Sequence, residues 1–258
     1  MKKFLKPLRI TSLLAAATLA GCATSGDPRD PIEGFNRGVY QFNDTFDEYL
    51  LNPVAKGYYA IAPAPVDKGI TNFFSNLNDV TVAFNDLLQF KFQHAAGDVG
   101  RVVINSTIGV LGFMDIATRM DLEKHDEDFG QTLATWGVGS GPYLVLPFLG
   151  PNTVRDTSGL VVDTFVDPIN QIKHIPTRNT LTALKIVDLR ADLLAIDDLK
   201  DVITKGVDPY DVIKNAYLQR RTWLIYDGEP PELDDDEYGD EDEAYYDYED
   251  DLEPTQAS

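Results

Sequence analysis

The sequence is poor in cysteine and in basic side chains. One cysteine, Cys22, occurs among 258 residues, which excludes an internal disulfide and a cysteine-rich zinc cluster. Lysine and arginine number 22 against 42 aspartates and glutamates, so the formal net charge is −20. Because nucleic-acid binding requires a basic surface, we expect no nucleic-acid partner.

Strand-like alternation of apolar and polar residues is nearly absent, so the predicted fold class is mainly α. Hydrophobic residues make up 43% of the chain, which suffices for a folded domain. Capping signals predict helix starts at Asp30-Pro31 and Asp208-Pro209, with each aspartate as N-cap. Apolar spacing predicts further helices over 72–92 and 181–194, and we expect Pro53, Pro63 and Pro65 to interrupt the stretch between the first two.

The first 21 residues have the order of parts of an export signal. Four basic residues precede a short apolar stretch that ends in Leu19-Ala20-Gly21-Cys22, which resembles a bacterial lipobox. This predicts cleavage before Cys22 and a diacylglycerol and a fatty acyl group on that cysteine, with no other cofactor. Ala23 follows where aspartate usually retains such lipoproteins in the inner membrane, so we expect an outer-membrane anchor facing the periplasm. The alternative is an ordinary signal peptide with a chance cysteine.

A run of 26 uncharged residues, 129–154, lies in the middle of the chain. It is long enough to span a bilayer, but its glycines and prolines would leave backbone groups unsatisfied in lipid, so we expect no full transmembrane span. A second uncharged run, 102–114, is likewise broken by Gly109 and Gly112. The residues alone leave two interpretations open: a buried, loop-rich core, or short helices in a membrane interface around a polar path.

The last segment, 227–258, contains sixteen acidic and no basic side chains, with tyrosines between them. It lacks core-forming periodicity, so we predict a disordered acidic tail. A loose calcium-chelating tail is the alternative, although the spaced ligands and glycine of an EF-hand loop are missing. The predicted domains are therefore a signal peptide over 1–21, a folded domain over 22–226 and the tail.

Candidate catalytic and metal-binding groups are few. His125, Glu127 and Asp128 lie close together, but the i,i+4 histidine pair of a helical metal site is missing. We therefore expect a solvated polar turn there, solitary histidines at 94 and 174, and no metal site. Ser140 lies in a glycine-rich stretch without the spacing of a nucleophile elbow. No catalytic set emerges, and we expect a protein that is not an enzyme.

Several motifs in order resemble those of the MlaA (VacJ) lipoproteins. The similarity runs from about residue 22 to 226 and leaves out the acidic tail. The matching segments are Asp30-Pro31-Ile32-Glu33-Gly34-Phe35-Asn36-Arg37, Phe42-Asn43, Asn72-Phe73-Phe74-Ser75-Asn76-Leu77, Asn105-Ser106-Thr107-Ile108-Gly109, Glu127-Asp128-Phe129-Gly130-Gln131-Thr132-Leu133, Trp136-Gly137-Val138, Gly141-Pro142-Tyr143, Leu146-Pro147, Gly150-Pro151, Arg155-Asp156, Asp208-Pro209-Tyr210 and Ala216-Tyr217.

The resemblance implies a ring of amphipathic and broken helices that lies in the membrane plane around a polar channel. It favours the second interpretation of the uncharged runs. It also implies transport: phospholipids mislocalised to the outer leaflet pass through the channel to a periplasmic carrier, and a trimeric porin is the usual partner. The candidate lipid-path or membrane-contact residues are Asn43, Asp44, Leu144, Val145, Leu146, Phe148 and Leu149. A passive structural or adhesive envelope lipoprotein and a periplasmic phospholipase remain as alternative functions.

Overall fold

The computed structural model describes residues 26–194, 197 and 206–231 of the chain. The predicted signal peptide, Cys22 and the tail from residue 232 onward lie outside these described residues. The described elements are α2 (Glu33–Phe46), the π-helical turn η1 (Asp47–Leu51), α3 (Asn52–Ile61), α4 (Ala64–Leu88), α5 (Phe92–Thr107), η2 (Thr118–Met120), α6 (Phe129–Thr135), β1 (Tyr143–Leu146), β2 (Gly150–Thr153), α7 (Val154–Val166), η3 (Pro168–Gln171), α8 (Ile175–Asp192) and α10 (Pro209–Ile225).

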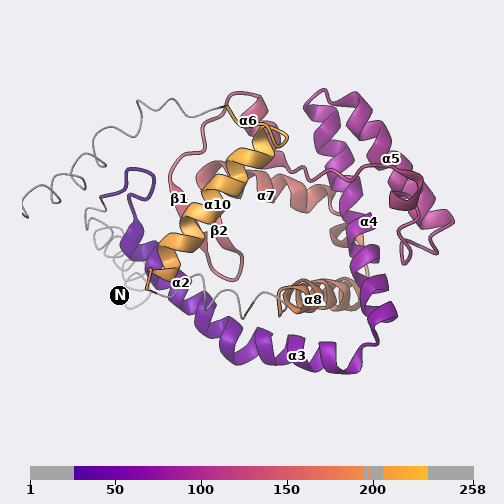
Figure 1. Cartoon of the computed structure of the whole chain (residues 1–258), viewed down its shortest axis with the longest axis horizontal. Coiled ribbons are helices and arrows are strands. Elements are labelled where there is room, and N and C mark those ends of the chain that lie inside the picture. The colour runs from indigo at the N-terminus through magenta and orange to yellow at the C-terminus, as the bar shows by residue number, and fades with distance from the viewer. Residues whose placement is uncertain (1–25, 195–196, 198–205, 232–258) are drawn as a thin grey trace, which may run out of the picture.

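The elements form a ring (Figure 1). Helix α2 contacts strand β1, β1 pairs with β2, and β2 contacts α7; α7 then contacts α4, α4 contacts α8, and α8 contacts α3. The ring closes because α3 continues through η1 into α2. Helix α5 packs outside this circuit against α4, and α10 contacts both α6 and β2. None of the helices in the described ranges has the length and hydropathy that crossing a membrane requires. The prediction of a mainly helical protein is confirmed.

The signal at Asp208 is confirmed, because its carboxylate accepts a hydrogen bond from the backbone N–H of Tyr210 at the start of α10. The signal at Asp30 is wrong. Helix α2 begins at Glu33 with no side-chain cap, and Asp30 is fully buried. Its carboxylate instead accepts hydrogen bonds from Asn36 Nδ2 at 2.7 Å and from the Tyr210 hydroxyl at 2.5 Å. Asp30 thereby joins α2 to α10.

Prolines interrupt the N-terminal helices only in part. Pro63 and Pro65 separate α3 from α4 as predicted. Pro53 does not break the chain's helical path, because the π-turn η1 precedes it and absorbs the missing N–H and the ring's clash with the preceding turn. The helix predicted over 72–92 starts earlier, at Ala64, and ends at Leu88, where Phe90 adopts φ 64° and turns the chain into α5.

The uncharged run 129–154 folds as the short helix α6 and a β-hairpin rather than as helices and turns only. Strands β1 and β2 are antiparallel, with Tyr143 opposite Thr153 and Leu146 opposite Gly150. Positive φ angles at Phe148 and Gly150 close the short loop between them. The sequence concealed this hairpin because β1 has only four residues and β2 contains a proline.

The interior of the described chain is polar. Buried polar and charged residues outnumber buried hydrophobic ones by nearly two to one. Asn85 on α4 is fully buried; its amide donates to Asp163 on α7 at 2.9 Å and accepts from the Thr132 hydroxyl on α6 at 2.9 Å. Arg101 on α5 is 1% exposed and donates to Asp79, to Asp115 and to the Leu122 carbonyl. Such groups hold a fold together only when each has its partners.

Large apolar side chains lie instead on the outside. Many of them are exposed, which reverses the usual distribution of a protein surrounded by water. On α4, Asn76, Asp79, Asn85 and Asp86 are buried, and the apolar residues Phe84 and Leu87 are exposed. The turn after α5 is a second case: Val110 and Leu111 adopt φ 55° and 59°, costly conformations for such side chains, and both are exposed.

Replacement of Arg101 tests the polar interior. Arg101→Met keeps the side chain's length but leaves Asp115 without the guanidinium and removes one of two cations that contact Asp79. We expect the free energy of unfolding in detergent to fall by about 3–5 kcal/mol, because a buried charge loses its partner. The control Val103→Ala, at an exposed apolar site on the same helix, should cost well under about 1 kcal/mol. Equal losses in the two variants would contradict the account.

Candidate functional site

Two asparagines on α2 hold the β-hairpin. Asn36 donates through Nδ2 to the Tyr143 carbonyl at 3.0 Å and accepts from the Val145 N–H at 2.9 Å. Asn43 repeats the arrangement, donating to the Leu146 carbonyl at 2.9 Å and accepting from the Phe148 N–H at 2.8 Å. Both ends of each amide are therefore satisfied by the hairpin backbone.

The spacing of the two asparagines matches the strand. Seven residues of α-helix rise about 10.5 Å, and the three strand residues between the paired backbone groups span about 10 Å. Asn36 contacts the beginning of β1 and Asn43 contacts its end, so α2 and β1 run in the same direction. An i,i+7 asparagine pair is thus the chemical match for this strand register.

An apolar groove lies where α2 meets the hairpin loop. It has a volume of ≈ 470 Å³, and its lining residues are Gly34, Phe35, Gly38, Val39, Phe42, Pro147 and Phe148. The Phe148 ring packs against the rings of Phe42 and Phe46, with centroids 5.2 Å and 4.9 Å apart. The two glycines leave the groove open, because nothing lies within 4 Å of a Cβ placed on either of them.

The loop residues Pro147, Phe148 and Leu149, which we name the hairpin tip, are exposed together. Phe148 is 61% and Leu149 62% exposed. The strand behind the tip alternates: Leu144 and Leu146 are half-buried, and Val145 is 2% exposed. Val145 packs with Tyr143 and Tyr210 in the small apolar core, so it is unavailable for lipid contact and its inclusion among the candidates is a correction.

The polar candidates have different positions. Asn43 is half-buried, and both hydrogen-bonding atoms of its amide are taken up by the hairpin, so its observed role is to position the tip. Asp44 is exposed on the adjacent face of α2. Sequence analysis did not find the groove residues Phe35 and Phe42 as site residues, although their helical spacing was visible.

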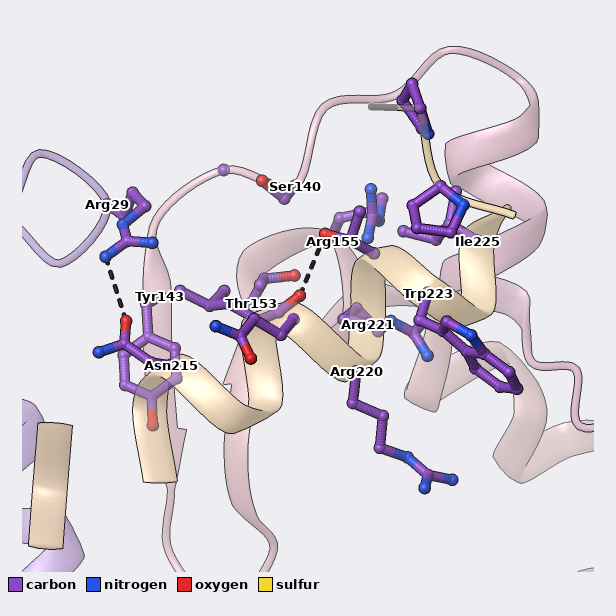
Figure 2. A pocket seen from close by; sticks show the side chains of 16 residues that line it. Arg29, Ser140, Tyr143, Thr153, Arg155, Asn215, Arg220, Arg221, Trp223 and Ile225 are labelled. Atoms are coloured by element: carbon purple, nitrogen blue, oxygen red, sulfur yellow. Dashed lines mark hydrogen bonds between the residues drawn. The ribbon is translucent and has the colours of Figure 1, made fainter. Parts of the chain in front are cut away.

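A larger pocket of ≈ 1230 Å³ lies between α10, β2 and the segment before β1 (Figure 2). Arginines 29, 155, 220 and 221 and Trp223 contribute to its lining. Each of these arginines contacts a carboxylate: Arg29 contacts Asp27, Arg155 contacts Asp156, Arg220 contacts Asp126, and Arg221 contacts Asp128. The pocket's positive charge is therefore largely neutralised within the protein.

Ser140 lies in the wall of this pocket (Figure 2). No residue that lines the pocket in the described ranges is a histidine, aspartate or glutamate, so Ser140 has no general base beside it there. The Ser140 carbonyl accepts from the Arg155 backbone N–H at 3.1 Å, a contact that fixes the loop. The pocket thus lacks the parts of a serine nucleophile.

A buried ion network behind the pocket joins α6, α7 and α10. Arg221 donates to Asp128 at 2.5 Å and 2.6 Å and to Asp156 at 3.0 Å, and the Tyr217 hydroxyl donates to Asp156 at 2.7 Å. Burial alone would lower the pKa of Arg221, but hydrogen bonds to Asp128 and Asp156 raise it above its usual value. The two basic residues near the end of α10 therefore contact carboxylates, in addition to any effect of the helix dipole.

Helices α6 and α7 approach closely above this network. A Cβ on Gly159 would come within 2.3 Å of the Gly130 backbone nitrogen, and a Cβ on Gly130 would meet the Arg221 guanidinium. Only glycine fits at these two positions. The sequence Asp128-Phe129-Gly130 thus combines a helix cap, through the Asp128 carboxylate on the Gln131 N–H, with a close helix contact.

Comparison with known proteins identifies the family. A family model described as MlaA lipoprotein matches residues 28–223. The chain belongs to the MlaA lipoprotein family. The intermembrane phospholipid transport system lipoprotein MlaA of Escherichia coli strain K12 is 35% identical over 231 residues, covering 86% of this chain and 90% of that protein. The protein of the same name from Haemophilus influenzae is 32% identical over 229 residues, covering 85% and 90%.

A solved structure from work on the structural basis for maintenance of bacterial outer membrane lipid asymmetry aligns with a TM-score of 0.67. It is 32% identical and covers 76% of this chain and 98% of that chain. The resemblance seen in the sequence motifs is thereby confirmed. Several MlaA-like motifs of this chain coincide with its ring contacts: Asn36 and Asn43 bind the hairpin, and Asp128, Gly130 and Asp156 join α6, α7 and α10.

Loss of the Asn43 amide should release the hairpin tip in this MlaA family member. In Asn43→Ala we expect the Phe148 backbone N–H to exchange with solvent about tenfold faster, because one net hydrogen bond contributes about 1 kcal/mol. Gln41→Ala, which removes an amide from an exposed site on the same helix, is the control. Hydrogen exchange in detergent measures both. Unchanged protection of Phe148 in Asn43→Ala would show that the amide does not hold the tip.

Proposed function

We propose that this protein is an outer-membrane lipoprotein that removes mislocalised phospholipids from the outer leaflet and so maintains lipid asymmetry. The observation that carries the proposal is the inverted ring: polar side chains fill the interior, and large apolar side chains cover the outside, in a chain of the MlaA family. Such a ring fits an interface where acyl chains surround the protein and head groups pass a polar path. Its relatives are named for intermembrane phospholipid transport.

The proposed placement is in the inner leaflet of the outer membrane, with an acylated Cys22 as anchor. The hairpin tip and the turn after α5 expose apolar side chains that acyl chains would cover. The proposal includes three partners: phospholipids as cargo, a soluble periplasmic carrier that receives them, and a trimeric porin that holds the ring in place. Each partner is carried over from the family resemblance.

The rival functions predict different outcomes in a deletion strain. If the protein removes stray lipid, deletion should raise outer-leaflet phospholipid, and the wild-type gene should restore the low level. A passive or adhesive lipoprotein would leave this level unchanged. A phospholipase would restore it only while purified protein also releases fatty acid or head group, and the absence of a general base around Ser140 argues against that chemistry. Unchanged outer-leaflet phospholipid after deletion overturns the proposal.

The anchor can be tested separately. Cys22→Ala removes the sulfur on which acylation depends, so we expect unprocessed or mislocalised protein after fractionation of the envelope. A serine variant at an exposed apolar site, Ile61→Ser, is the control for loss of one hydrophobic side chain. Normal outer-membrane fractionation of Cys22→Ala would contradict the lipoprotein anchor.

A charge on the hairpin tip should weaken membrane insertion. Phe148→Asp and Leu149→Asp place a carboxylate at side chains that we expect to meet acyl chains, at a cost of about 2–3 kcal/mol each. We expect both variants to be exported, to be extracted from membranes more easily and to raise outer-leaflet phospholipid. Phe148→Leu keeps the tip apolar and should behave as wild type. Full insertion and low outer-leaflet phospholipid in both aspartate variants would show that the tip faces water.

A further inference from the structure

A cluster of titratable side chains lies at the turn between α4 and α5, apart from the hairpin and the arginine pocket. Asp86 comes from the last turn of α4, Asp98 from α5, and His125 from the segment before α6. One ligand atom from each of the three lies within 4.8 Å of the others. The sequence analysis placed His125 in a solvated turn, and that prediction is wrong, since its ring contacts the fully buried Asp98 and the neighbouring Glu127 is buried.

The carboxylates of this cluster have unfilled hydrogen-bonding capacity. Asp86 and Asp98 are both fully buried. Neither oxygen of Asp86, nor Oδ1 of Asp98, has a hydrogen-bond partner among the described residues. Unpaired buried carboxylates are costly, so such a pair requires a cation or a proton. Burial and the facing carboxyls of Asp98 and Glu127 raise the pKa of Asp86 to about 8.

The nearest cation does not fill this role. The Lys91 ammonium contacts Glu127 Oε1 at 2.7 Å and Asp227 Oδ1 at 2.5 Å. No item of contact joins it to Asp86 or Asp98 by a salt bridge in the described chain. The two buried aspartates therefore face a histidine and each other.

We propose that Asp86, Asp98 and His125 bind a divalent transition-metal ion of the zinc class. Ligand atoms around a tetrahedral zinc ion lie about 3.3 Å apart, given bonds of about 2.0–2.1 Å. The observed His125 Nδ1 to Asp98 Oδ2 distance of 2.9 Å and the 4.8 Å limit for the group bracket that value. Two carboxylates balance the charge of the ion, and imidazole selects it over the hard cations Mg²⁺ and Ca²⁺.

His94 completes the surroundings of the site. Its ring stacks on that of His125 with centroids 4.1 Å apart, and its Nδ1 lies 3.9 Å from Asp86 Oδ1 without a hydrogen-bond partner. The His94 side chain is 40% exposed, so it lies between the buried aspartates and solvent. It is the nearest group for a fourth ligand position. The predicted solitary His94 is thus a second correction.

A metal bound here would join three parts of the chain. It would fix the segment that contains His125 to the α4–α5 pair, directly before Asp128 caps α6. The expected effect is structural: higher thermal stability without any requirement for the ion in lipid movement. The proposal therefore stands or falls independently of the proposed function.

The test is zinc titration of the full-length protein in detergent after chelator treatment, with 5 mM-scale magnesium replaced by a simple excess of MgCl₂ to occupy the acidic tail. We expect one Zn²⁺ per chain and a rise in the unfolding temperature. His125→Gln and the near-isosteric Asp98→Asn should each weaken binding at least about tenfold. His174→Gln, which removes a histidine at the start of α8, is the matched control and should bind as wild type.

Three results would overturn the proposal. Equal zinc binding in His125→Gln and wild type would place the ion elsewhere, and suppression of binding by MgCl₂ would assign it to the acidic tail. An unfolding temperature that zinc leaves unchanged would show that Asp86 and Asp98 share a proton instead. If the variants fail to fold, X-ray absorption of the zinc-loaded wild type decides: we expect imidazole among the ligands, and a site without imidazole contradicts the proposal.

Discussion

Hydrogen bonds between buried polar side chains hold this ring together. Little apolar surface is available for the task, because the small apolar core around Tyr143, Val145 and Tyr210 is the largest that the described residues form. The elements are joined instead by amides and ion pairs: Asn36 and Asn43 bind the hairpin, Asn85 links α4 to α7, and Arg221 links α10 to α6 and α7. Each link is directional, so it fixes geometry as well as stability.

This constraint has a consequence for the outer surface. Once polar groups occupy the interior, the apolar faces of α2, α4 and α5 must lie outside, where Phe42, Phe84 and Val103 are exposed. In water such a surface would be a liability, whereas acyl chains would cover it at no cost. The strained turn after α5, with Val110 and Leu111 at positive φ, belongs to the same surface. A ring of this kind suits the transport role proposed for the protein.

The sequence predicted the class of fold and several element starts. The Asp208 cap, the helix of 181–194 within α8 and the absence of a spanning helix in the described ranges followed from local patterns. It did not reveal which face of each helix lies inside, because periodicity separates two faces without saying what surrounds them. It also missed the Asn36 and Asn43 contacts, whose partners lie more than 100 residues away. His94 and His125 looked unrelated for the same reason.

The most direct test of the inverted ring is the accessibility of spin labels attached to single cysteines in the reconstituted protein. Cys22 is the chain's only cysteine and would be blocked by its acyl chain, so labels at Leu111, Phe148 and Phe165 report their own surroundings. Oxygen concentrates in the acyl region, and a charged or polar nickel chelate stays in water. We predict strong oxygen and weak nickel accessibility at all three positions, with the reverse at the exposed Lys173. Strong nickel accessibility at all four positions would contradict the account.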